Sequence, residues 1–429
     1  MSNYKIYQII LLLTPFVFSF AFGLDIYIPI IPQMTEIFDT TPAMVHLTLS
    51  LFLGATGLGQ LFIGPLSDRY GRKIVFNLAS IFYISGSLLC AVAPHIGVLI
   101  AGRLICAFGA CGMLVTSFAL IRDLYSQDES AKMYSYLNGA IGISPTFAPI
   151  IGGYLSVYFG WQSIFIFLSL IGFCTLFVTW AFIDETHEKQ KRVSLDKEIL
   201  NRYRTIFSNR QFLTYTLIAS FAEGVFFCFF SISPFIIIDL LGVETQNFGY
   251  YFALFGGVIA FGGVGSGKLI ERKGIQATIR SGIALMILGG ICMLTWDYFV
   301  GLTFFGFLFP MVLACTGAIF VIGACASKAL EPFAPIAGTA AAALGAMEFG
   351  ISSVIGAMLM LFPVSSTAPY GAIIVISGLL CVILYKCRPF TTPESEVKFE
   401  FEAKAEFKPS LELSAWASSS ETKNAPLGE

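Results

Sequence analysis

Charged residues are scarce in this chain of 429 residues. Lys, Arg, Asp and Glu make up 12% of it and hydrophobic residues 56%, whereas a soluble domain carries about a quarter charged residues. The net charge is only −2, so the chain lacks the basic surface that a nucleic-acid partner requires. The apolar residues stand in long runs, not in the short alternating segments of a membrane β-barrel. This scarcity of charge indicates a helical integral membrane protein.

The motifs of several other protein classes are also missing. None of the ten cysteines forms a CxxC pair or stands near one of the three histidines at metal-ligand spacing. We therefore predict no metal site and interpret the cysteines as small packing residues. There is neither a Walker motif nor a dinucleotide-binding fingerprint, so ATP-driven transport has no support. We predict that the protein is not an enzyme and that it needs no cofactor.

Twelve apolar runs are long enough to cross a bilayer, which takes about 20 helical residues. They predict an all-α membrane protein in two six-helix bundles. The expected spans lie near residues 7–31, 43–63, 74–94, 97–120, 132–153, 162–183, 211–238, 246–266, 277–295, 299–321, 334–361 and 369–386.

The distribution of Lys and Arg predicts the orientation. The six loops that would face outward contain neither residue, and of the 25 basic residues only Arg103 falls well inside a span. Cytoplasmic loops carry the excess of Lys and Arg, so we expect both termini in the cytoplasm and the chain in the inner (cytoplasmic) membrane. The expected cytoplasmic loops lie at 64–73, 121–132, 184–210, 267–280 and 328–331.

One loop motif occurs twice. Glycine, acid, arginine and glycine follow one another at the same spacing in Gly64–Lys73 and in Gly267–Gly274, each time after the second helix of a six-helix half. This pattern predicts a parallel duplication, a known plan of secondary transporters. The predicted parts are an N-terminal bundle at 1–183, a cytoplasmic linker at 184–210, a C-terminal bundle at 211–388 and a polar, disordered cytoplasmic tail at 389–429.

The repeated loop has the composition of a conformational latch. Its glycines allow a tight turn, and an acid there can sit at a neighbouring helix N-terminus, where negative charge is favoured. Ordinary cytoplasmic loop charge would account for the arginines but not for Asp68, and we expect Asp68 and Arg69 to act as a latch and not to contact substrate. The latch candidates are Gly64, Asp68, Arg69, Gly71 and Arg72 in the first half and Glu271 and Arg272 in the second.

Four ionisable side chains lie inside the predicted spans, leaving aside groups at helix ends such as His46. They are Asp25, Arg103, Glu223 and Glu348, and in lipid such a residue is a functional hypothesis by default. Pro29 and Pro32 follow Asp25 and would free backbone carbonyls there. We expect these four residues to serve proton coupling or substrate binding.

Each of these residues also has a simpler interpretation that the sequence leaves open. Asp25 could be a polar residue near the outer interface, and Arg103 could extend its side chain to that interface. Glu223 and Glu348 belong to the second half, where we expect substrate choice to be decided. Glu348 could bind a cation or carry a proton, or it could act as a neutral hydrogen-bonding group between helices.

Gly64–Lys73 resembles the signature loop of the major facilitator superfamily, and the resemblance extends over residues 8–388. Within that superfamily the chain is similar to drug/proton antiporters of the bicyclomycin- and chloramphenicol- (florfenicol-) resistance type. The residues that carry this similarity are Asp25–Pro32, Arg103, Arg122–Tyr125, Ser233-Pro234 and Ala337–Thr339. The resemblance implies that Arg103 takes part in proton coupling and that an acid at the place of Asp25 is typical.

A further segment resembles the antiporter motif of proton-driven exporters, with Pro149, Gly152 and Gly153 at its characteristic positions. This chain departs from the family pattern at three places. Ala148 replaces the leading glycine of that motif, Cys106 stands where a glutamine often follows Arg103, and Glu348 stands where many relatives have glutamine.

These observations predict a proton-coupled exporter of small lipophilic, drug-like compounds that works by alternating access. Its expected partners are the substrate, protons and the lipid bilayer, and we expect a monomer. Two alternatives remain open. The same scaffold could export an endogenous metabolite such as a siderophore, amino acid or nucleoside, or the chain could be a membrane sensor or scaffold without flux. In the last case Asp25→Asn would leave every transport assay unchanged.

Overall fold

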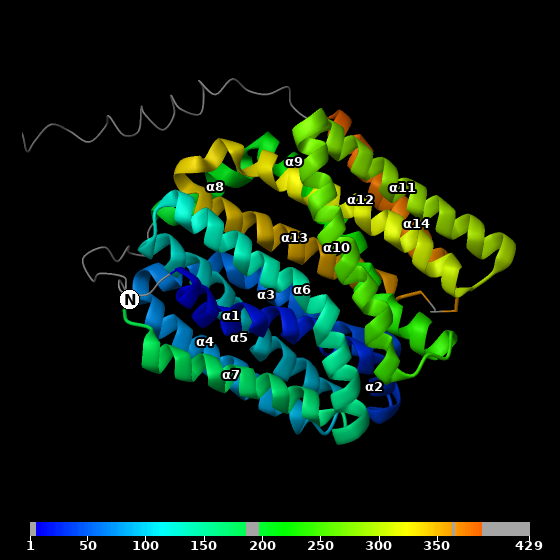
Figure 1. Ribbon diagram of the computed structural model, residues 1–429, viewed down its shortest axis with the longest axis horizontal. Coiled ribbons are helices and arrows are strands. Elements are labelled where there is room, and N and C mark those ends of the chain that lie inside the picture. Colours follow the sequence, from blue (N-terminus) through cyan, green and yellow to red (C-terminus); the bar gives the residue numbers. More distant parts are fainter. Residues whose placement is uncertain (1–5, 186–196, 363–364, 388–429) are drawn as a thin grey trace, which may run out of the picture. The chain divides into compact units, whose positions relative to one another are not determined.

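The computed structural model describes residues 6–185, 197–362 and 365–387. Within them all regular structure is helical, and twelve spans are long and apolar enough to cross a membrane. Figure 1 shows the long helices lying side by side in a bundle. The predicted all-α, twelve-span class is therefore confirmed. The orientation across the membrane stays a prediction, and the tail at 389–429 lies outside the described residues.

The first half of the chain supplies the first six spans. The elements are α1 (Ile6–Asp25), η1 (Ile28–Ile30), α2 (Ile31–Ile37), α3 (Pro42–Tyr70), α4 (Arg72–Ala91), α5 (Ile96–Leu124), α6 (Gln127–Phe159) and α7 (Gln162–Phe182).

The second half follows after a short helix, α8 (Lys197–Ser208). Its elements are α9 (Arg210–Pro234), the single π-helical turn η3 (Phe235–Leu240), α10 (Thr245–Lys273), α11 (Ile275–Val300), α12 (Phe304–Leu330), η4 (Glu331–Ile336), α13 (Ala337–Leu359) and α14 (Ala368–Lys386).

Several helices extend beyond the apolar runs that predicted them. α3 continues to Tyr70 and α10 to Lys273, because the charged residues after the apolar run still form helical turns. The first span was predicted near 7–31 as one helix, and this was wrong in detail. α1 ends at Asp25, and the span continues through η1 and α2 to Ile37. Pro29 and Pro32 have no backbone N–H to continue the α-helical ladder across this break.

The repeated loop motif folds into the same turn twice. Gly71 separates α3 from α4 with φ +103°, and Gly274 separates α10 from α11 with φ +83°. In each case the glycine N–H donates to a carbonyl four residues earlier, that of Ser67 at 3.1 Å and that of Ile270 at 2.8 Å. Only glycine adopts this left-handed backbone at little cost. The last glycine of each loop motif, Gly71 and Gly274, is therefore required by the backbone conformation of the turn.

Two helix pairs join the first half to the second. α3 packs against α13 and α6 packs against α10, and both pairs lie at the centre of Figure 1. Small residues bring the backbones close, as is usual between membrane helices. A Cβ atom on Gly57 of α3 would lie 3.2 Å from the carbonyl oxygen of Ala346 in α13. One on Gly249 of α10 would lie 2.6 Å from the backbone nitrogen of Ile150 in α6.

The segment predicted as a polar linker contains the helix α8. Its residue Ile206 is fully buried, and the Tyr203 hydroxyl donates to the carbonyl of Leu61 in α3 at 2.9 Å. Burial, and to a lesser degree the negative charge of Asp68, raises the pKa of Tyr203 to about 12. Residues 6–387, apart from the gaps, form one compact unit, so the division into two bundles at 184–210 stays a prediction.

The contact between α6 and α10 gives a test of the packing. Gly249→Ala adds a methyl group against the backbone of Ile150, and we expect this overpacking to lower the stability by about 1–3 kcal/mol. Gly257→Ala, two turns further along α10, meets no atom within 4 Å. It should be neutral or should stabilise by up to about 1 kcal/mol, because alanine favours a helix more than glycine does.

The measurement is the thermal unfolding midpoint of the two purified variants and the wild type in detergent. If Gly249→Ala melts at or above the wild-type temperature, the close contact between α6 and α10 is not as described.

Candidate functional site

Asp25 stands at the break in the first span. It is the last residue of α1 and its side chain is 3% exposed. A Cβ atom on Gly152 of α6 would collide with the carbonyl of Ile26, the residue after Asp25. The predicted antiporter motif therefore forms the wall beside Asp25, and the glycine at 152 is what lets α6 approach the broken segment.

The other members of the motif lie along the same helix. Pro149 lies inside α6, and a Cβ atom on Gly153 would lie 2.8 Å from the carbonyl of Thr245, the first residue of α10. Nearby, the Gln33 side chain of α2 donates to the Thr245 hydroxyl at 2.9 Å. Motif residues thus contact the Asp25 break on one side and the second half on the other.

Arg103 of α5 is fully buried. Its Nη1 donates to the carbonyl of Gly23 in α1 at 2.6 Å. The guanidinium carbon lies 4.3 Å from the ring centroid of Phe52 and 5.0 Å from that of Tyr27. Nε and Nη2 have no hydrogen-bond partner. Aromatic faces and one carbonyl thus hold the cation in place of water.

Arg103 binds a backbone carbonyl and not an acid. Among the described residues Arg103 forms no ion pair with Asp25 or with any other carboxylate. Its side chain does not extend to the surface either, as the alternative interpretation required. Its only bond goes to the backbone two residues before Asp25. The role of Arg103 in proton coupling stays a prediction.

Glu223 and Glu348 lie close together in the second half. Glu223 is in α9 and Glu348 in α13, two helices that pack against each other. The two helices meet beside them, where the Ser352 hydroxyl lies 3.4 Å from the carbonyl of Ser220. Both glutamates are half-buried, and Oε1 of Glu348 is buried without a hydrogen-bond partner. Neither pairs with a basic side chain among the described residues.

A stack of aromatic rings connects the two groups of predicted residues. The Phe20 ring of α1 lies 6.5 Å from that of Phe52 and 5.5 Å from that of Phe349, each at an interplanar angle of 16°. Phe52 lies beneath the Arg103 guanidinium, and Phe349 follows Glu348 in α13. The four residues therefore form two groups, Asp25 with Arg103 and Glu223 with Glu348, on either side of this stack.

His46 was set aside as a helix-end group, and the structure corrects that interpretation. It lies in the second turn of α3 and is fully buried. Its Nδ1 is 3.1 Å from the hydroxyl of Ser50, and Nε2 has no partner. Its ring centroid lies 5.9 Å from that of Phe227 in α9. The spacing of His46 and Ser50, one helical turn apart, is a sequence signal that could have drawn attention to this histidine.

Arg72 makes the most contacts of the predicted latch residues. It is 1% exposed, and it contacts Asp68 at 2.6 Å and Asp123 of α5 at 2.7 Å. It also donates to the Ser67 hydroxyl. The backbone N–H of Arg72 begins α4 and donates to Glu185 at 3.0 Å, which places a carboxylate at a helix N-terminus. Asp123 and Glu185 were missed as latch residues, because nothing in their local sequence shows that they converge on Arg72.

The remaining latch candidates are less engaged. The guanidinium of Arg69 is exposed and lies 5.3 Å from the ring centroid of Tyr70, its neighbour in sequence. In the second copy Glu271 and Arg272 are exposed and form no ion pair among the described residues. A Cβ atom on Gly64 would meet nothing within 4 Å. Arg69 was predicted to act as a latch together with Asp68, but in the structure Asp68 pairs most closely with Arg72.

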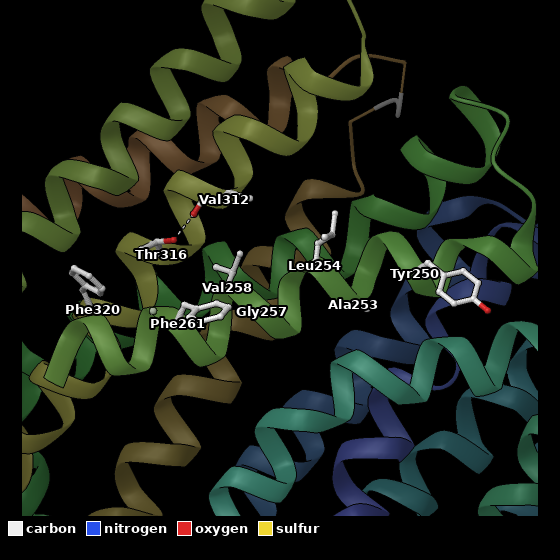
Figure 2. Close-up of a pocket in the computed structure, with 10 residues that line it drawn as sticks. Tyr250, Ala253, Leu254, Gly257, Val258, Phe261, Val312, Thr316 and Phe320 are labelled. Carbon is white, nitrogen blue, oxygen red and sulfur yellow. Dashed lines mark hydrogen bonds between the residues drawn. The ribbon is translucent and has the colours of Figure 1, made fainter. Parts of the chain in front are cut away.

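A groove of about 610 Å³ lies between α10 and α12 and begins at Tyr250, the residue after Gly249 (Figure 2). It is lined by Tyr250, Ala253, Leu254, Gly257, Val258, Phe261, Gly262, Val312, Thr316 and Phe320. The Thr316 hydroxyl donates to the carbonyl of Val312 in its own helix at 2.7 Å. The residues that line it are mostly apolar, and Tyr250 and Thr316 contribute hydroxyl groups.

Within the described part of the chain no three His, Cys, Asp or Glu side chains cluster as metal ligands do. Twelve apolar helices around buried acids and a buried arginine define a class, that of the multi-span membrane transporters. The chain belongs to the Major Facilitator Superfamily, whose family model matches residues 13–357.

Curated relatives share about three residues in ten with this chain. A bicyclomycin resistance protein homolog of Haemophilus influenzae is 30% identical, covering 83% of this chain and 91% of that protein. A chloramphenicol resistance protein of Pseudomonas aeruginosa is 29% identical, covering 89% and 91%. The multidrug resistance protein MdtL of Shigella flexneri is 28% identical, covering 83% and 88%. The predicted resemblance is confirmed.

Solved structures confirm the fold. A D-xylose–proton symporter superposes with a TM-score of 0.72 at 16% identity, covering 92% of this chain and 99% of that one. A bacterial homolog of the human lysosomal transporter Spinster gives a TM-score of 0.69 at 17% identity, covering 91% and 100%. Family and fold both point to a transporter and not to an enzyme.

The latch gives a matched pair of substitutions. Arg72→Ala leaves the carboxylates of Asp68 and Asp123 without their shared cation. Breaking a fully buried pair costs about 3–5 kcal/mol. These carboxylates are 36% and 18% exposed, so we expect a loss of about 2–3 kcal/mol, since solvent screens part of the charge. Arg69→Ala should change stability by less than about 0.5 kcal/mol.

Thermal unfolding of the two variants in the same detergent distinguishes them. Equal midpoints for Arg72→Ala and Arg69→Ala would contradict the stabilising role expected for the contacts of Arg72.

Proposed function

We propose that this protein exports small lipophilic compounds across the cytoplasmic membrane in exchange for protons. The observation that carries the proposal is the similarity, over most of the chain, to proteins named for resistance to bicyclomycin and chloramphenicol. Resistance of this kind is what an exporter of such compounds would confer. Both termini would face the cytoplasm, the working unit would be a monomer, and the proton gradient would replace any cofactor.

The acids inside the spans support the proton coupling. Asp25, Glu223 and Glu348 are the carboxyl groups that the chain places deep among apolar helices. A carboxylate in such surroundings is costly while it is charged, and a proton removes that cost. Protons arriving from the outside would neutralise one or more of these groups. They would thereby shift the conformational equilibrium that substrate binding also shifts.

The contacts between the halves support alternating access. α3 with α13 and α6 with α10 are the pairs that meet across the molecule, and glycines let them approach closely. In transporters of this plan the halves rock against each other around a central site. Arg72 with Asp68 and Asp123 would hold the predicted cytoplasmic end of the first half in one of the two arrangements.

Transport in inverted membrane vesicles tests the proposal. Vesicles that contain the protein should accumulate chloramphenicol when their interior is acidified. Collapse of the pH gradient with nigericin should return accumulation to the level of vesicles without the protein. Accumulation that persists without a gradient would refute proton coupling. A failure to transport any compound of a drug library would refute export itself.

Asp25→Asn keeps the shape of the side chain but removes the ionisable group. We expect it to lower gradient-driven accumulation by at least about tenfold, because removing a required proton-transfer group costs about 10²–10⁴ in rate. The control is Asp39→Asn in the exposed turn after α2, which should leave accumulation unchanged. Wild-type accumulation by Asp25→Asn would show that this carboxyl group does not couple transport to protons.

A further inference from the structure

His46 occupies the place where three long helices from both halves meet. It lies on α3 and contacts Phe227 of α9. A Cβ atom on Gly356 of α13 would lie 3.3 Å from its ring carbon Cε1. Gly356 therefore leaves just enough room for the imidazole. The ring fills the space between α3 and the second half near the end where α3 begins and α13 ends, which is the predicted outer end.

The surroundings of His46 satisfy one ring nitrogen and leave the other without a partner. Nδ1 lies 3.1 Å from Ser50 Oγ, while Nε2 is buried and has no hydrogen-bond partner. An unpaired polar atom in a buried site costs about 1–3 kcal/mol. A leucine or phenylalanine would avoid that cost. The imidazole of His46 is retained at this cost between helices of the two halves, so we expect it to have a function.

Among the described residues no carboxylate pairs with the His46 ring. The charged groups on the neighbouring helices are Glu223 on α9, one turn before Phe227, and Glu348 on α13, two turns before Gly356. Asp25 of α1, Glu36 of α2 and Arg103 of α5 lie on other elements that pack against α3. The remaining charged groups stand at the opposite, predicted cytoplasmic ends of these helices: Asp68 and Arg69 of α3, Arg72 and Lys73 of α4, Arg122 and Asp123 of α5, and Arg210 of α9. None of them forms an ion pair with His46 among the described residues.

We infer that His46 is a proton-binding site that controls the outer closure of the transporter. Nε2 takes a proton from the outer medium when the outer ends of the halves part, and the ring becomes an imidazolium. The closed packing against Phe227 and Gly356 accommodates the neutral ring only, because a charged ring would place an Nε2–H donor in a buried site where the described residues offer no acceptor. Arg103 differs, since its guanidinium donates to the carbonyl of Gly23. The proton returns to the same outer side before closure, so His46 adds nothing to the number of protons carried.

The position of His46 gives protons a short route. Thr41 and Pro42, one turn before His46, are exposed, whereas Val45 and His46 are buried. A small separation of α3 from α13 would therefore hydrate the ring first. Histidine suits this role because its ordinary titration lies between about pH 5 and 8. The inference rests on the proposed proton-driven export, since it concerns the state that would admit protons from outside.

Distances between spin labels on the two halves test the inference without substrate. Val92, at the α4–α5 turn, is 73% exposed, and Tyr298, near the end of α11, is 83% exposed. Cysteines at these two places report the outer separation. Cys174, Cys292 and Cys387, the natural cysteines that are not buried, would be replaced by serine. Measurements in lipid nanodiscs at about pH 8 and about pH 5.5 bracket the titration range of histidine.

We expect acidification of the protein with its natural His46 to raise the ratio of the longer to the shorter distance by at least about tenfold. His46→Gln and His46→Phe should show the short distance at both pH values, because neither can become charged. His46→Arg should show the long distance at both, because its charge is permanent. Glu36→Gln, an exposed acid on α2, is the control and should respond to pH as the unchanged protein does.

Two results would overturn the inference. One is the absence of any pH response with His46 present, and the other is an unchanged response in His46→Gln and His46→Phe. The uncharged variants are expected to show the short distance and the permanently charged variant the long one. If one kind of variant misfolds, the other kind still tests the inference. Chloramphenicol accumulation in inverted vesicles is measured separately, so export can fail while the pH response persists, or the reverse.

Discussion

Charge inside a bilayer must be stabilised by the protein itself, because no water is present to do so. Arg103 illustrates this constraint. One carbonyl of α1 and the faces of two aromatic rings surround its guanidinium, and no carboxylate in the described part of the chain pairs with it. This arrangement fixes α5 against the part of α1 that ends at Asp25. The acid Asp25, the helix break and the close approach of Gly152 all lie within three residues of Gly23, whose carbonyl holds this cation.

The same constraint governs where the halves can meet. Membrane helices gain little from the hydrophobic effect against each other, so close backbone contact and a few polar groups decide their association. Glycines supply that contact between α3 and α13 and between α6 and α10. Such surfaces are smooth, and they can part and meet again without leaving many polar groups unpaired. A few polar groups do meet there, such as the hydroxyls of Tyr154 and Tyr250, 3.0 Å apart. His46 differs from them because its Nε2 has no partner among the described residues, and water would solvate it once the helices separate.

The two copies of the repeated loop have the same turn but different surroundings. In the first half Arg72 is buried between Asp68 and Asp123, and Glu185 caps the following helix. In the second half Glu271 and Arg272 are exposed. The acids are also distributed unequally: the first half has Asp25 beside its broken helix, and the second has Glu223 and Glu348 on two helices that pack together. A duplicated framework therefore carries two unlike sets of charged groups.

Apolar runs and glycine spacing, which are local properties, determined the twelve spans, the all-α class and the two equivalent turns at Gly71 and Gly274. The resemblance of short motifs was enough to indicate the family. Only the tertiary structure showed which side chains lie close to one another. A span that is apolar on all sides has no polar face, so its sequence does not indicate which side packs against which neighbouring helix. For this reason the sequence did not show that Arg72 rather than Arg69 is buried or that Arg103 binds a carbonyl. Nor did it show that His46 lies between the halves.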